Sequence, residues 1–124
     1  MSKHLERDLD ELQKDLLALA ASVEEAIHKA IRALQERDVA LAEEVVDGDN
    51  DIDEEENHVE EECLKVLALH QPVAVDLRRV TAVLLINTDL ERIADHATNI
   101  AEDVIYLVEG AIVRHRPAAV RGDD

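Results

Sequence analysis

The feature that most constrains this chain is a set of three long stretches in which apolar residues recur every three or four positions. That spacing gathers apolar side chains on one stripe of an α-helix, as a helix packed in a bundle requires. The stretches cover residues 3–35, residues 39–69, and the segment from about Pro72 to Val108. Only three Gly and two Pro occur in 124 residues, so little interrupts these helices. We therefore predict an all-α fold of three long helices.

Short connections separate the predicted helices. Asp38 is expected to cap the second helix, Pro72 to open the third, and Gly110 to stop it. Helices joined by so few residues run antiparallel to their neighbours, which predicts an up-down-up three-helix bundle. In this prediction residues 1–108 form the bundle, and residues 109–124 form a flexible C-terminal tail.

The net charge of the chain restricts the classes of partner that it can bind. Thirty Asp and Glu against thirteen Lys and Arg give a formal charge of −17. Such a field repels phosphate backbones and anionic lipid, so we expect neither nucleic acid nor a membrane surface as a partner. No apolar run approaches the roughly 20 residues of a membrane span, and residues 1–12 lack the apolar core of a signal peptide. The single cysteine, Cys63, falls on an apolar stripe and is expected to be a small core residue. We therefore expect a cytoplasmic protein whose partners are cations or basic protein surfaces.

Polar residues interrupt the apolar stripes in the middle of the second and third helices. The acidic belt, as we name this group, consists of Asp49, Asp53, Glu56, Asn87, Glu91 and Asp95. If the chain folds back near residue 70, Asp49 lies level with Glu91, and Asp53 lies level with Asn87. Ionised carboxylates in such a seam repel one another and lose hydration, and a bound cation such as Mg²⁺, Ca²⁺, Mn²⁺ or iron would relieve this. The alternative is a solvated acidic face, because acidic pairs four residues apart are common in so acidic a chain.

Three segments of the chain resemble the repeat of the PhoU family. They are DGDNDID at residues 47–53, HQPVAVDLRRV at residues 70–80 and DLERIADHATNIAED at residues 89–103. The resemblance implies a three-helix bundle whose (E/D)-x-x-x-D motifs bind iron or zinc at the surface of a helix pair. The ligands it implies in this chain are Asp49, Asp53, Glu91, Asp95 and Asn99.

The same motifs imply supporting roles for further residues. Additional ligands, or residues that hold the ligands, are Glu56, Asn87, His96 and Glu102. Arg78 and Arg92 also lie in the matching segments, and each is expected either to pair with a neighbouring acid or to contact an anion such as phosphate.

The PhoU resemblance also implies a function. The family restrains high-affinity phosphate uptake and is thought to connect the ATPase of the Pst phosphate transporter to the PhoR-type sensor histidine kinase. Typical members carry two tandem repeats, and this chain carries one, which predicts a homodimer that rebuilds the two-repeat body. We therefore expect a negative regulator that acts by protein contact and is not an enzyme.

Two other classes compete with this interpretation. A ferritin-like di-iron protein would need Glu-x-x-His motifs on facing helices, and the chain contains Glu25 with His28 and Glu55 with His58. Both motifs fall off the apolar stripes, and three helices are one too few for such a site. A purely structural interaction bundle, in which the acids only confer solubility, is the other alternative.

Overall fold

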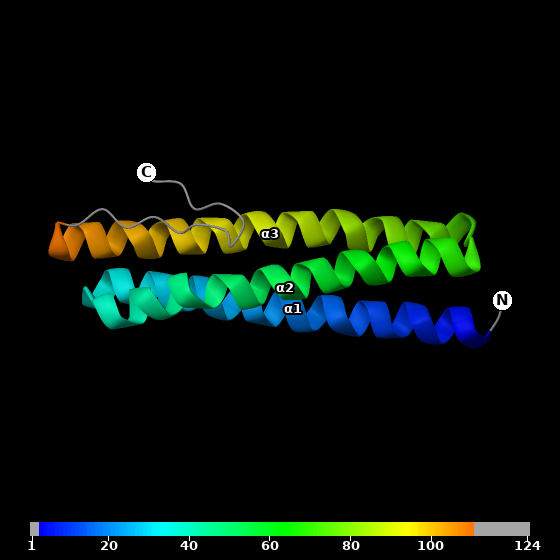
Figure 1. Ribbon diagram of the computed structural model, residues 1–124, viewed down its shortest axis with the longest axis horizontal. Coiled ribbons are helices and arrows are strands. Elements are labelled where there is room, and N and C mark those ends of the chain that lie inside the picture. Colours follow the sequence, from blue (N-terminus) through cyan, green and yellow to red (C-terminus); the bar gives the residue numbers. More distant parts are fainter. Residues whose placement is uncertain (1–2, 111–124) are drawn as a thin grey trace.

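The structure is a computed structural model that describes residues 3–110, and it shows three long helices packed side by side (Figure 1). These are α1 (Lys3–Glu36), α2 (Val39–His70) and α3 (Ala74–Glu109). The chain reverses direction at each connection, and every helix packs against the other two. The predicted up-down-up bundle is therefore confirmed. The predicted tail lies outside the described residues from residue 111 on. None of the three helices has the length and hydropathy of a membrane span.

The helix ends follow local chemistry. The Leu41 backbone N–H donates to Asp38 Oδ1 at 3.0 Å, which confirms the predicted cap of α2. Gly110 ends α3 with a left-handed φ of 74°, as predicted. Pro72 is buried but precedes α3, which begins at Ala74, so its predicted place in the first turn is wrong. Gln71, whose φ is 46°, ends α2 in the left-handed region, where its N–H donates to the Leu67 carbonyl at 3.1 Å. The helical segment thus closes before the proline.

The core consists of two apolar clusters that follow one another along the bundle. One is built from large aliphatic side chains such as Leu12 and Val80, and the other is rich in alanine. The two clusters meet at Ala26, which packs against both. Cys63 is fully buried, which confirms it as a core residue, and burial raises the pKa of its thiol to about 11. The thiol therefore stays protonated at neutral pH and is a poor nucleophile.

Candidate metal centre between α2 and α3

Among residues 3–110, five polar or charged side chains are buried, and all of them lie on α2 or α3. They are Asp49, Glu56, Asn87, Thr98 and Glu102. Thr98 Oγ1 donates a hydrogen bond of 2.9 Å to Asp49 Oδ1, and Asn87 Nδ2 donates one of 3.1 Å to the backbone carbonyl of Glu56. These two bonds tie α2 to α3 across the acidic belt. The bond from Thr98 also orients the Asp49 carboxylate.

The register of the two helices differs from the predicted one. Because α2 continues to residue 70 and α3 begins only at residue 74, the chain reverses around Pro72. This reversal places Asp49 level with Asp95 and Asp53 level with Glu91. The predicted pairing of Asp49 with Glu91 was therefore wrong by about one helical turn. The corrected register brings the two (E/D)-x-x-x-D motifs to the same height of the bundle.

The electrostatics of Glu56 show that the belt carboxylates act on one another. Glu56 is buried, with 6% of its surface exposed, and its pKa is raised to about 8. Loss of hydration on burial is the largest cause, followed by the negative charges of Asp53, Glu91, Asp95 and Asp49. Glu56 is therefore mostly protonated at neutral pH. All four predicted acidic ligands lie close enough to influence its titration.

Two buried oxygen atoms of the belt have no hydrogen-bond partner in the described part of the chain. They are Glu56 Oε2 and Asn87 Oδ1. Buried oxygens of this kind are normally satisfied by protein, water or an ion. A cation held between α2 and α3 would offer both atoms a partner. The belt thus has the oxygen-rich donor set that Mg²⁺, Mn²⁺, Ca²⁺ or iron prefers.

The predicted ligands differ in their exposure to solvent. On α2, Asp49 is buried and Asp53 is half-buried. On α3, Glu91, Asp95 and Asn99 are exposed. Glu91 was expected on the buried stripe of α3, and this was wrong because its position lies at the edge of the α2–α3 contact. The belt consequently has a deep α2 side and an open α3 side, through which an ion could enter from solvent.

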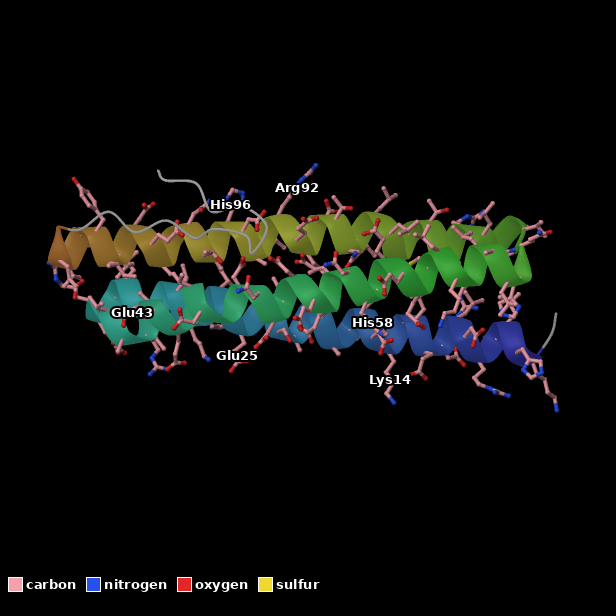
Figure 2. All side chains as sticks on the ribbon, in the orientation of Figure 1. Lys14, Glu25, Glu43, His58, Arg92 and His96 are labelled. Carbon is pink, nitrogen blue, oxygen red and sulfur yellow. The ribbon has the colours of Figure 1, made fainter. Side chains whose placement is uncertain are left out.

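The remaining predicted residues lie around this centre. Glu102 is buried, whereas His96 and Arg92 are exposed and project from α3 away from the other helices (Figure 2). Arg92 Nη1 lies 3.9 Å from Asp89 Oδ1 on the same helix. Arg78 is exposed. The belt carboxylates thus lie near enough to raise the pKa of Glu56, and the Arg92 guanidinium points outward.

Fold and site together define the chain as a three-helix bundle protein with a carboxylate-rich centre on one pair of helices. The sequence profile of the PhoU domain matches residues 16–104. The chain is 45% identical over 103 residues to a phosphate-specific transport system accessory protein PhoU homolog of Aquifex aeolicus (strain VF5), a match that covers 83% of this chain and 47% of the relative. A homolog of the same name from Pseudomonas putida is 39% identical over 109 residues, covering 88% of this chain and 43% of that protein.

A solved structure shows the same relationship in three dimensions. The crystal structure of the phosphate transport system regulatory protein PhoU from Streptococcus pneumoniae matches with a TM-score of 0.80 and 34% identity. The match covers 89% of this chain and 52% of that one. The chain belongs to the PhoU family. It spans about half the length of the curated relatives it matches.

Proposed function

We propose that this chain is a cytoplasmic negative regulator of phosphate uptake, a metal-binding adaptor between a Pst-type phosphate transporter ATPase and a PhoR-type histidine kinase. Membership of the PhoU family supports this proposal, as do the names of the relatives, which describe accessory or regulatory proteins of phosphate transport. The adaptor acts by protein contact and catalyses no reaction. The single observation that carries the metal-binding part is the buried Glu56, whose pKa four neighbouring carboxylates help to raise.

Different residues of the belt would supply different ligand atoms to the ion. Asp53, Glu91 and Asp95 supply carboxylate oxygens from the half-buried and exposed parts of the belt. Asp49 supplies a carboxylate already oriented by the Thr98 hydroxyl. Asn99 lies one turn beyond Asp95 on α3 and adds an amide oxygen. The ion, which we take to be iron or zinc, neutralises the repulsion that burial imposes on this group.

Elemental analysis of the purified chain tests the metal part of the proposal. A variant with Asp49→Ala and Glu91→Ala should lose a stoichiometric metal that the unaltered chain retains. The matched control, Asp47→Ala with Asp103→Ala, removes two exposed carboxylates from the same two helices and should keep the metal. Equal metal content in both double variants would show that the ion is held elsewhere.

A reporter of the phosphate-starvation response tests the regulatory part. Cells that lack the chain should express the reporter even when phosphate is plentiful. Complementation with the unaltered chain should restore repression, and complementation with the Asp49→Ala, Glu91→Ala variant should not. A reporter that stays repressed in phosphate-replete cells without the chain would refute the regulatory role, whatever the metal content.

We also propose that the chain forms a homodimer through a surface shared by α1 and α3. The two helices run parallel, and Arg79 of α3 lies 3.5 Å from Glu6 and 3.7 Å from Asp10 of α1. Steps of seven residues from these positions lead along each helix to apolar side chains with 42% to 61% exposure. We name this set the α1–α3 apolar face: Leu17, Ile31, Leu34, Ile86, Ile93 and Leu107.

A second copy of the chain is the occupant that we propose for the α1–α3 apolar face. Six large aliphatic side chains are exposed along these rows, which Glu24 and Gln13 interrupt on α1, and exposed apolar groups of this kind often mark protein contacts. The chain also spans about half the length of its relatives. A second copy, docked on the α1–α3 apolar face, would cover these side chains and place two bundles side by side. The α2–α3 belt would stay open to solvent in that dimer.

A further inference from the structure

A second cluster of metal-ligand side chains lies on the other edge of α2, where this helix meets α1. It consists of Asp15 on α1 and of His58 and Glu62 on α2. One ligand atom from each of the three lies within 4.8 Å of the others. His58 and Glu62 are four residues apart, so they lie along one side of α2. Figure 2 shows His58 at the boundary between α2 and α1.

We propose that Asp15, His58 and Glu62 form a binding site for a divalent transition ion of the zinc class, separate from the acidic belt. Imidazole nitrogen and carboxylate oxygen are both ligand types that zinc takes, and open zinc sites have three protein ligands with a fourth position left for water or substrate. Two carboxylates also balance the double positive charge of the ion.

The separation of the donor atoms suits that ion. His58 Nε2 lies 3.3 Å from Asp15 Oδ2. Bonds of about 2.0–2.1 Å in a tetrahedral site require ligand atoms about 3.3–3.4 Å apart. This pair of atoms therefore already has the spacing of one tetrahedral edge. Glu62 completes the site through a rotation of its own flexible side chain.

The contacts of Glu62 leave it available for an ion. Lys65 Nζ lies 3.6 Å from Glu62 Oε2, and the Lys65 side chain is 71% exposed. An exposed ion pair of this kind contributes at most about 1 kcal/mol. A divalent ion that also gains His58 and Asp15 as ligands would displace the lysine.

An acidic groove adjoins the cluster and provides access to it. The groove has a volume of about 590 Å³, and Asp15 and His58 both line it. Gly48 lies further along its wall, where an added Cβ would meet no atom within 4 Å. The open position of a bound ion could therefore be filled by water, or by a ligand that enters along the groove.

A second histidine–aspartate pair between α2 and α1 serves as a comparison for this site. His70 Nε2 lies 2.8 Å from Asp8 Oδ2, so it forms a second bridge between α2 and α1. In the described residues, the His70–Asp8 pair has no third His, Cys, Asp or Glu atom at the spacing seen for Glu62. If a histidine beside an aspartate were enough to bind zinc, both the His58–Asp15 and the His70–Asp8 pairs would bind it. We expect only the His58 cluster, which has Glu62 as a third ligand, to bind zinc.

Nuclear magnetic resonance of the histidine rings tests this proposal on the full ¹⁵N-labelled chain, freed of metal and titrated with zinc alone. The His58→Gln variant assigns the His58 signals. We expect the titration, carried past the one ion that the belt would hold, to move the ring nitrogens of His58 and to leave those of His70 in place. Asp15→Asn and Glu62→Gln should each weaken the His58 response at least about tenfold, whereas His70→Gln should not change it.

Two results would overturn the site. One is a His58 ring that does not respond to excess zinc, and the other is an unchanged zinc response in Glu62→Gln. Circular dichroism of each variant checks that the helices are intact. Zinc held by the belt alone would leave the His58 signals in place, so the two sites are tested separately. The Asp49→Ala, Glu91→Ala variant should retain the full His58 response.

Discussion

The buried Glu56 provides the most direct test of the electrostatics of the belt. Replacement by Gln keeps the shape of the protonated side chain and removes its titration. Burial and four neighbouring carboxylates raise the pKa of Glu56 from 4.5 to about 8. Between these values the folded chain still holds a proton that the unfolded chain has lost. The stability of the unaltered chain should therefore fall as the pH rises from 4.5 to 8.

The size of this loss follows from the two pKa values. Each pH unit within the window removes up to about 1.4 kcal/mol from the free energy of unfolding. Near pH 8 Glu56 also loses its proton in the folded chain, so the free energy of unfolding then depends less on pH. The loss between pH 6 and pH 8 is therefore about 2 kcal/mol. Over the whole window the loss is at most about 5 kcal/mol, and any water reaching Glu56 makes it smaller. The Glu56→Gln variant should lack this component entirely.

Urea unfolding followed by circular dichroism, with a chelator present, measures the effect at several pH values. We expect the stability of Glu56→Gln relative to the unaltered chain to rise by about 2 kcal/mol from pH 6 to pH 8. Glu54→Gln, which removes an exposed carboxylate from the same helix, is the control and should follow the unaltered chain. Equal losses in the unaltered chain and in Glu56→Gln would refute the raised pKa and the crowding of the belt.

Two further predictions concern the surface and the helix ends. In analytical ultracentrifugation at tens of micromolar, the unaltered chain and Leu69→Glu on α2 should sediment as dimers, whereas Ile93→Glu should be a monomer because it buries a charge in the α1–α3 apolar face. An unaltered chain that sediments as a monomer would contradict the dimer. Gln71→Gly should raise the free energy of unfolding by about 1 kcal/mol in urea titrations, because glycine adopts the left-handed φ of 46° without steric cost. A loss of stability in that variant would show that the Gln71 side chain contributes more than its backbone strain costs.

The three-helix bundle could be predicted because the sequence signals that define its helices act between residues close together in the chain. Apolar spacing defined all three helices, and Asp38 and Gly110 marked two of their ends through chemistry that acts within a few residues. The third helix was predicted to begin at Pro72 because proline is common in a first turn. The left-handed φ of Gln71 ends α2 just before the proline, and α3 begins only at Ala74.

The candidate sites depend on the register between helices, which the apolar pattern specifies less closely. A shift of the turn from residue 70 to Pro72 moved the residue opposite Asp49 by about one turn. The motifs on α2 and α3 still met, because each repeats its acid after four residues. The cluster with His58 had only a weak signal, namely the four-residue spacing of His58 and Glu62. Its third member, Asp15, lies on α1, where no motif identifies it.

A three-helix bundle has three edges where helices meet, and here each edge carries different chemistry. The α2–α3 edge holds oxygen donors, and the α1–α2 edge holds a histidine beside two carboxylates. The α1–α3 edge carries exposed aliphatic side chains beside the ion pairs of Arg79 with Glu6 and Asp10. The α1–α3 apolar face is the surface best suited to a permanent protein contact, because burying its aliphatic side chains gains hydrophobic free energy. A second copy on that edge would leave both acidic edges open. Metal binding and contact with a transporter or a kinase would then use surfaces that dimerisation does not cover, so the state of the metal could alter partner binding without dissociation of the dimer.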